Sequence, residues 1–362
     1  MDERIIRMKL EQIRARTVRQ RWPVRGWEAR LAEHLAPGEY SYLGDWEPLP
    51  DGDSLWPAGK TLFLRGHAVA PDVPAEDLYL AFDADGLEGL LSVDGRPYAG
   101  VDPQHLRVVM PRTGPLDLSI ECMCLGASLS HAELRREKAR LREIAFVWVD
   151  RAVEAAGYDL WLAWEAAKFA SDERRKALLE AALEEALLIT DLTAPDETFR
   201  QQMDEARQRL AARVEAIAPD PEAGRIFLTG HTHIDTAWLW PLRETVRKVA
   251  RTFASQIGLI ERYPGYKFGA SQPQLYAFCK EHYPALYAKV KQAVADGSWE
   301  LQGGMWVESD CNIPSGESLV RQLLIGRNFY RDEFGVEVKN LWLPDVFGYS
   351  ANLPQIMKTA GI

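Results

Sequence analysis

The sequence predicts a multidomain protein of the α+β and α/β classes: a small N-terminal β-sheet domain, long linker helices, and then a parallel β/α barrel-like domain. Three observations lead to this fold class. The chain has 362 residues, which is too long for one ordinary hydrophobic core. Short strand-like runs precede residue 128, and helical spacing follows it. Strand and helix then alternate to the end. We therefore divide the chain into a helical arm (1–37), a β-sheet domain (38–128), connecting helices (129–218) and a β/α domain (219–362).

The composition, 47% hydrophobic and 27% charged, is typical of a soluble globular protein. The N-terminus is charged from its second residue and has no apolar core of a signal peptide. No stretch approaches the apolar length of a membrane span. Four cysteines are too few for a disulfide framework in a chain of this length. The sequence therefore predicts a reduced, cytoplasmic protein that has no membrane as a partner.

The first segment, residues 1–37, is predicted to form short helices. Residues 1–30 contain nine Lys or Arg residues against four acids, although the whole chain has a net charge of −10. The overall negative charge argues against nucleic acid as a partner. We interpret the basic segment as one that docks on an acidic surface of its own molecule or of a partner subunit. A homo-oligomer is left open.

The second segment contains strand-like runs such as "KTLFLRGHAVA", "DLYLAFDADG" and "LDLSIECMC". They are separated by Asp-Gly dipeptides at 51–52, 85–86 and 94–95, which favour tight hairpin turns. This pattern predicts an all-β domain.

The third segment is predicted to be helical from about residue 128 because apolar residues share helical faces. Ser171 and Thr193 stand where helix N-caps are expected, the latter with Asp196 three residues on. The boundary is expected at 218–224, "APDPEAG", because of its prolines and glycine. The two faces are Leu134, Leu141, Ile144, Ala145 and Trp148, and Met203, Ala206, Leu210, Val214 and Ile217.

The fourth segment alternates between strand and helix patterns. Expected strands are "RIFLTG", "YKFGAS", "WELQGGMW" and "NLWLP", with amphipathic helices between them. Ser271 and Gln274 fit a capping box with Pro273 in the first helical turn. In parallel β/α folds, ligands gather at the carboxyl ends of the strands. Polar residues at these ends are therefore the first candidates for a functional site.

The stretch "GHTHIDTAWLWP", residues 230–241, places His231, His233 and Asp235 at the end of the first of these strands. Side chains two residues apart in an extended backbone point the same way, so all three are expected to face one side. Imidazole nitrogens and carboxylate oxygens are ligands that a divalent ion such as zinc accepts. A hydrogen-bonded polar cluster that closes a strand end explains the same pattern, and spacing leaves both interpretations open.

A second stretch, "LWLPDVFGYSANLPQ", places Asp345 after the last expected strand. A carboxylate there can complete a metal site, attack an electrophile, or cap the next helix. The nearby aromatic residues Trp238, Trp240 and Phe347 suit stacking against a sugar ring, although core packing explains tryptophans equally well.

Four blocks of the sequence, in order, resemble the family 38 α-mannosidases, in particular their cytosolic and bacterial branch. They are "GHTHIDTAWLWPLRETVRKVARTF", "SQPQLYAF", "GSWELQGGMWVESDCNIPSGESLVRQ" and "LWLPDVFGYSANLPQI". The stretch "FDADGLEGLLSVDGRPYAGVD" also resembles the β-domain that precedes the catalytic domain in that branch. The resemblance thus covers most of the chain.

The resemblance implies retaining, metal-dependent hydrolysis of terminal α-mannosides in oligosaccharides, as in catabolic glycan trimming, with one divalent ion, zinc or cobalt. It implies that His233, Asp235 and Asp345 bind the ion and that Asp345 is also the nucleophile. It implies that Trp238 and Phe347 line the sugar subsite. His231 matches a histidine that does not bind the ion directly.

The family also needs a further histidine ligand and an acid/base carboxylate, which the resemblance places beyond residue 362. We therefore expect this chain to be an incomplete copy that is inactive by itself. Two alternatives stay open. An amidohydrolase-type metal hydrolase would use His231 and His233 as joint ligands, and a non-catalytic sugar-binding or assembly module would use the β-domain and half a barrel.

Overall fold

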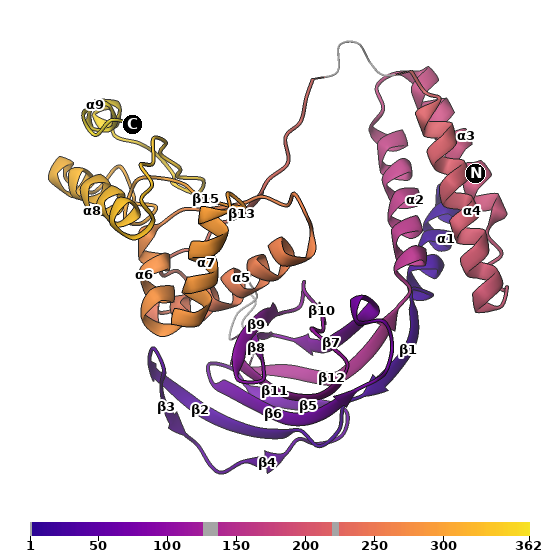
Figure 1. The fold of residues 1–362 in the computed structure, drawn as a ribbon, viewed down its shortest axis with the longest axis horizontal. Helices are drawn as coiled ribbons and strands as arrows, with labels where there is room; N and C mark the ends of the chain where they lie inside the picture. The colour runs from indigo at the N-terminus through magenta and orange to yellow at the C-terminus, as the bar shows by residue number, and fades with distance from the viewer. Residues whose placement is uncertain (1, 126–136, 219–223) are drawn as a thin grey trace.

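The computed structural model describes residues 2–125, 137–218 and 224–362. Figure 1 shows three parts: a β-domain, a group of helices that stands on one end of it, and a C-terminal α/β part above its other end. The mixed, multidomain α and β character that the sequence predicts is therefore confirmed. Within the described ranges, no helix combines the length and the apolar character that crossing a bilayer requires.

The N-terminal segment begins with the expected helix, α1 (Glu3–Ala15), which Asp2 caps by accepting a hydrogen bond from the backbone N–H of Arg4. The prediction of helices for the rest of residues 1–37 is wrong, since β1 (Val18–Pro23) and β2 (Glu28–Ala36) follow. Each pairs antiparallel with a distant strand, and these long-range hydrogen bonds outweigh the weak local preference for helix. The helical arm is thus part of the β-domain from residue 18 onward.

The basic residues of this segment pair with acids of the same chain. Arg16 contacts Asp196 at 2.6 Å, and Nε of Arg19 donates to the Asp150 carboxylate at 2.8 Å. The guanidinium of Arg21 contacts Glu143. This arrangement agrees with the interpretation that the basic segment docks on its own molecule.

The β-domain consists of two antiparallel sheets. One has the order β1-β12-β7-β10, with β5 paired to β12, and the other has the order β3-β2-β6-β11-β8-β9, with β4 paired to β2. Leu62 and Leu118 of the second sheet share a core with Leu80 and Phe82 of the first, so the sheets pack face to face. The remaining strands are β3 (Glu39–Tyr42), β4 (Glu47–Pro48), β5 (Ser54–Pro57), β6 (Thr61–Ala70), β7 (Leu78–Asp85), β8 (Leu87–Val93), β9 (Arg96–Val101), β10 (Arg107–Val109), β11 (Gly114–Cys124) and β12 (Lys138–Val149).

Strand β12 corrects a second prediction, because Leu141, Ile144, Ala145 and Trp148 were expected on one helical face. The segment is instead a strand that pairs with β7 on one side and with β1 on the other. A continuous apolar run fits a buried strand as well as a helix, so periodicity alone misassigned it. Leu134, predicted on the same face, lies outside the described residues.

The connecting helices are α2 (Arg151–Phe169), α3 (Glu173–Ile189) and α4 (Asp196–Glu215), and they pack with α1 around one core. The predicted apolar face of α4 is confirmed for Met203, Ala206 and Leu210, which are buried, whereas Val214 is exposed and Ile217 lies beyond the helix. The predicted N-caps are wrong by one and two residues. Asp172 caps α3, accepting from the N–H of Arg175 at 2.9 Å, and Pro195 precedes α4. Most of the boundary expected at 218–224 lies outside the described residues.

The C-terminal part contains three short parallel strands, β13 (Gly230–Thr232), β14 (Phe268–Ala270) and β15 (Trp299–Leu301), in that order. Their parallel pairing and the helices between them agree with the predicted β/α alternation. The helices are α5 (Leu242–Arg262), α6 (Pro273–His282), α7 (Pro284–Ala295), α8 (Gly316–Phe334) and α9 (Leu353–Thr359).

Three local predictions in this part are wrong. Only the last residue of "RIFLTG", Gly230, lies in a strand, and "NLWLP" forms none. The side chains of Ile226, Phe227 and Leu228 are exposed, and an apolar run becomes a strand only where a neighbouring strand completes its hydrogen bonds. The capping box is also absent. Gln272 occupies the N-cap of α6 with a positive φ and no side-chain cap, although Pro273 is in the first turn as expected.

Candidate metal centre

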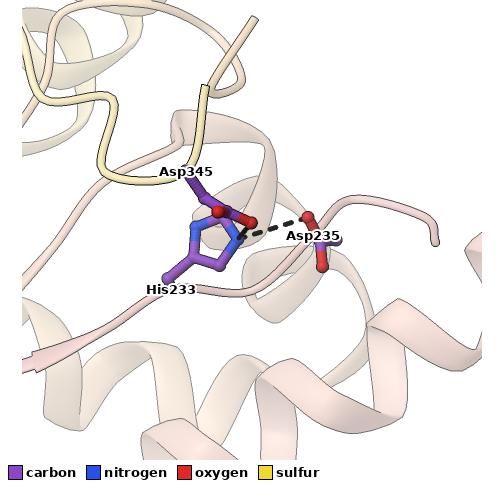
Figure 2. Close-up of side chains that lie close together, drawn as sticks. All are labelled: His233, Asp235 and Asp345. Carbon is purple, nitrogen blue, oxygen red and sulfur yellow. Dashed lines mark hydrogen bonds and ion pairs between the residues drawn. The ribbon is translucent and has the colours of Figure 1, made fainter. Parts of the chain in front are cut away.

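Three side chains that lie far apart in the sequence meet beyond the end of β13. Nε2 of His233 lies 3.2 Å from Oδ1 of Asp235 and 3.6 Å from Oδ2 of Asp345. One potential ligand atom from each residue lies within 4.8 Å of the others. Figure 2 shows both carboxylates close to the His233 imidazole. The structure thus brings together the three residues that the resemblance assigns to the metal.

The parallel sheet positions the first two of these residues. Gly230 of β13 pairs with Phe268 of β14, and its N–H donates to the carbonyl of Lys267 at 2.8 Å. His233 and Asp235 follow in the loop at the carboxyl end of β13. This is the end of a parallel strand at which ligand-binding residues gather.

Asp345 reaches the site from a different kind of segment. It was predicted at a strand end, but it lies in a turn within residues 335–352, which form no helix and no named strand. A single β-bridge between Cys311 and Tyr349 tethers this segment, and the Ser350 N–H donates to the carbonyl of Cys311 at 2.9 Å. The Asp345 side chain is 56% exposed, so it faces both His233 and solvent.

Glu308, which the sequence pattern did not predict as a site residue, is the buried carboxylate of the site. Its side chain is 4% exposed, and its two oxygens contact Nδ1 of His233 and the Ser271 hydroxyl, which donates to it. The contact with Glu308 is the main cause that raises the pKa of His233 to about 9. A signal was available in the sequence. Glu308 follows β15 in the chain as His233 follows β13, and parallel strands bring their carboxyl ends to one edge.

Gln272 links the loops that follow the three parallel strands. Its Nε2 donates to the carbonyl of Ile234 at 2.8 Å, while its Oε1 accepts from the Thr236 hydroxyl at 3.0 Å and from the Glu308 N–H at 3.2 Å. Its backbone has φ +64°, a conformation that residues other than glycine rarely adopt. Because the nitrogen and the oxygen of the side-chain amide both make hydrogen bonds, this backbone conformation is stabilised. The same bonds hold the three loops in fixed positions relative to one another.

His231 lies apart from the cluster. Its Nε2 accepts a hydrogen bond from Nε1 of Trp342 at 2.8 Å, and burial lowers its pKa. The expectation that His231, His233 and Asp235 face one side together is therefore wrong for His231. It belongs to the strand itself, whereas the other two lie in the loop after it, where the alternation of an extended strand no longer applies.

The two predicted aromatic residues lie on the same segments as the carboxylates and are open to solvent. Trp238 is 56% exposed and packs edge-to-face on Trp240, whose indole N–H donates to Thr245 at 3.1 Å. Phe347, two residues after Asp345, is 94% exposed. Neither ring is used by the protein core, which leaves both free to contact a ligand.

Comparison with known proteins gives one family and several named relatives. Residues 223–362 match the Glycosyl hydrolases family 38 N-terminal domain. Alpha-mannosidase 2C1 of Homo sapiens is 35% identical over 356 residues, which are 94% of this chain and 34% of that protein. Alpha-mannosidase G of Dictyostelium discoideum is 48% identical over 138 residues, covering 38% of this chain and 13% of the relative. An alpha-mannosidase of Saccharomyces cerevisiae is 35% identical over 233 residues, 61% of this chain and 21% of the relative. The chain spans about a third of the length of the first of these relatives.

Proposed function

We propose that this chain, which belongs to glycosyl hydrolase family 38, supplies the nucleophile and most of the metal ligands for the retaining hydrolysis of terminal α-mannosides. The observation that carries the proposal is the meeting of His233, Asp235 and Asp345 in a family 38 domain. The substrates would be mannose-containing oligosaccharides, since the relatives are named alpha-mannosidases. For residues 224–362 we propose the first part of a parallel, barrel-like β/α domain.

The chemistry of the donor atoms fits a divalent ion, and we propose zinc or cobalt. Ligands at about 2.1 Å from a tetrahedral ion lie about 3.4 Å from one another. The separations of 3.2 and 3.6 Å from Nε2 of His233 to the two carboxylates are close to this value. One neutral imidazole and two carboxylates also balance the charge of such an ion. When bound, the ion would polarise and orient the sugar hydroxyls as positive charge develops on the ring.

Asp345 would act as the nucleophile. A retaining mechanism forms an ester between a carboxylate and the anomeric carbon, and a second carboxylate then helps water to release the sugar. The open position of Asp345 suits the first of these roles. Glu308 does not suit the second, because both of its oxygens are buried and engaged. We propose that the acid/base carboxylate and a further histidine ligand come from the region that the longer relatives carry beyond the aligned residues.

Trp238 and Phe347 would form the walls of the sugar subsite. Aromatic faces stack on the apolar faces of sugar rings, and these two exposed rings lie on the segments that carry Asp235 and Asp345. We further propose a cytoplasmic location, which agrees with the four free, buried cysteines among the described residues. The oligomeric state stays a prediction.

The geometry favours this function over the amidohydrolase alternative. That alternative needs His231 and His233 as joint ligands, but Nε2 of His231 is engaged by Trp342. The test is hydrolysis of an aryl α-mannoside by an enzyme that contains these residues. Turnover is expected to stop in a chelator, to return with zinc or cobalt, and to release α-mannose first. Turnover that survives complete metal removal, or release of the β-anomer, would contradict the proposal.

A further inference from the structure

We propose that Glu308 is a positioning residue for the metal centre: it fixes the His233 imidazole so that Nε2 faces Asp235 and Asp345. The inference rests on the proposed function, because it concerns how this chain holds the ion. It goes beyond the ligand set, since the contacts of Glu308 among the described residues are with His233, Ser271 and Gln272.

The environment of the Glu308 carboxylate fixes its orientation. A carboxylate that is removed from water is costly unless its oxygens are engaged by donors. Glu308 is 4% exposed, and each oxygen has its own partner, Oε2 with Nδ1 of His233 and Oε1 with the Ser271 hydroxyl. Its backbone N–H is also bound, to Oε1 of Gln272 at 3.2 Å. The carboxylate is therefore held in one orientation by three neighbours from two segments of the chain.

Glu308 also selects the tautomer of the His233 imidazole. A carboxylate beside Nδ1 accepts a hydrogen bond from the N–H of that nitrogen, so the neutral ring carries its proton on Nδ1 and keeps its lone pair on Nε2. Nε2 is the atom that faces Oδ1 of Asp235 and Oδ2 of Asp345. Without Glu308, the neutral ring could place its proton on Nε2, in the form that cannot bind an ion, and could also rotate away from the two carboxylates.

His233, Ser271 and Glu308 come from the loops that follow three neighbouring strands. His233 follows β13, Ser271 follows β14, and Glu308 follows β15. The three strands are hydrogen-bonded neighbours in one parallel sheet. The His233 side chain lies in a loop and is 27% exposed. Its contact with Glu308 connects it to the loop after β15, so the paired strands hold the position of the imidazole. A ligand on a loop is held precisely only when such a contact supports it.

The experiment is a cobalt titration of the 362-residue chain, in competition with a chromophoric chelator and followed by the visible absorption of the bound ion. Glu308→Gln keeps the size of the side chain and removes its charge, and Glu308→Ala removes the acceptor altogether. Both are expected to weaken cobalt binding about 10- to 100-fold. At saturating cobalt, both are expected to change the absorption spectrum. Glu308→Asp, one methylene shorter, is expected to recover part of the affinity.

The matched control is Glu300→Gln, since Glu300 is an exposed carboxylate of β15 itself, and its cobalt affinity and spectrum are expected to be unchanged. A merely structural role for Glu308 would lower the thermal midpoint of the variants and leave the spectrum of the bound cobalt unaltered, which would overturn the inference. Unchanged affinity in both Glu308→Gln and Glu308→Ala would overturn it as well. If the unsubstituted chain binds no cobalt, the proposed metal centre fails, and the inference fails with it.

Discussion

Arg251 of α5 reaches across to Glu88 of β8, with 2.6 Å between Nη2 and the Oε2 of the carboxylate, and both side chains are less than 10% exposed. Lys248 contacts the same oxygen at 2.6 Å. Arg247 of the same helix approaches Glu121 of β11 at 3.1 Å. The C-terminal α/β part is therefore joined to the β-domain by buried ion pairs. Figure 1 shows α5 lying against this side of the β-domain.

This contact bears on the site because α5 begins directly after the loop that carries His233 and Asp235. On α5, Glu244 binds Arg247 and also contacts Arg251 at 3.1 Å. Glu88 and Glu121 supply the other negative charges from the β-domain. The network balances three cations with three carboxylates, so the loss of any one leaves a buried charge uncompensated.

The first prediction is that Glu88→Gln strongly destabilises the chain. Removing one member of a buried ion pair costs about 3–5 kcal/mol, because Lys248 and Arg251 would stay buried without their carboxylate. The free energy of unfolding is measured by urea denaturation. Glu317→Gln is the control, since Glu317 pairs with Arg321 on the exposed surface of α8, and its loss is expected to cost less than about 0.5 kcal/mol. Equal effects of the two substitutions would show that the network does not join the two parts.

The second prediction separates the two histidines of the motif. His233→Ala is expected to weaken zinc binding by more than about 100-fold, whereas His231→Ala is expected to weaken it about 10-fold or less, because His231 contacts Trp342 and not the cluster. A competition titration with a chromophoric chelator measures both affinities. An equal loss in the two variants would favour the amidohydrolase alternative, in which both histidines are ligands.

The elements that the sequence predicted well are those whose pattern is decided locally. The helix α5 alternates apolar and polar residues at a clear helical period, and the Asp-Gly turn at 94–95, which joins the paired strands β8 and β9, needs no distant partner. The hairpin turns expected at 51–52 and 85–86 are wrong, because each of these dipeptides connects strands of two different sheets. The helix prediction for Lys138–Val149 was wrong because this buried apolar segment forms a strand through pairing with the strands on both of its sides. The strand prediction for residues 340–344 was wrong for the opposite reason: the segment is mostly apolar, but no strand pairs with it in the described part of the chain.

The site residues also divide into those that local spacing predicts and those that depend on contacts between distant segments. The motif around His233 and Asp235 could be read from spacing, since both lie in one short loop. That Asp345 comes to them from 110 residues away could be expected only through the family resemblance, which is why spacing left its role open. Glu308 was missed because a single glutamate after a strand is an ordinary feature, and only the fold shows that it is buried against a histidine. Contacts between distant segments are what spacing cannot supply.

The third prediction concerns pH and His34. Burial is the main cause that lowers the pKa of His34 to about 4, and its Nε2 has no hydrogen-bond partner among the described residues. Between pH 6.5 and 4 the unfolded chain binds a proton at this residue that the folded chain does not, so stability falls as the pH falls through this window. We expect the loss to be about 1–2 kcal/mol, reduced from the full effect because the side chain is only partly buried. Urea denaturation at pH 7 and pH 4.5 measures it, and His34→Gln is expected to show a smaller decrease. The same decrease in both proteins would assign it to other groups.

The fourth prediction concerns the subsite. Phe347→Ala is expected to raise KM for an aryl α-mannoside by about 5- to 10-fold, because a ring that is 94% exposed stabilises substrate and not the fold. Its thermal midpoint is expected to match that of the unsubstituted protein. Phe329→Ala is the control, because it removes a ring that packs against Trp306 and Tyr330. This substitution should lower the thermal midpoint, whereas Phe347→Ala should not. An unchanged KM in Phe347→Ala would remove this residue from the sugar subsite.

The last prediction tests Asp345 as the nucleophile. Asp345→Asn is expected to abolish turnover in an enzyme that contains this chain, even at saturating metal, because an amide can still offer its oxygen to an ion but is too poor a nucleophile to form the glycosyl ester. The side chain is 56% exposed and its contact with His233 is at 3.6 Å, so the substitution is not expected to disturb the fold. An activated fluoro-sugar should label the unsubstituted enzyme on the peptide that contains "LPDVFGYS" and should leave the Asn variant unlabelled. Asp310→Asn is the control, since Asp310 lies two residues after Glu308 in the chain and its oxygen accepts from the backbone N–H groups of Asn312 and Ile313. In this variant the peptide that contains Asp345 should still be labelled. A label on any other carboxylate would leave Asp345 as a metal ligand alone.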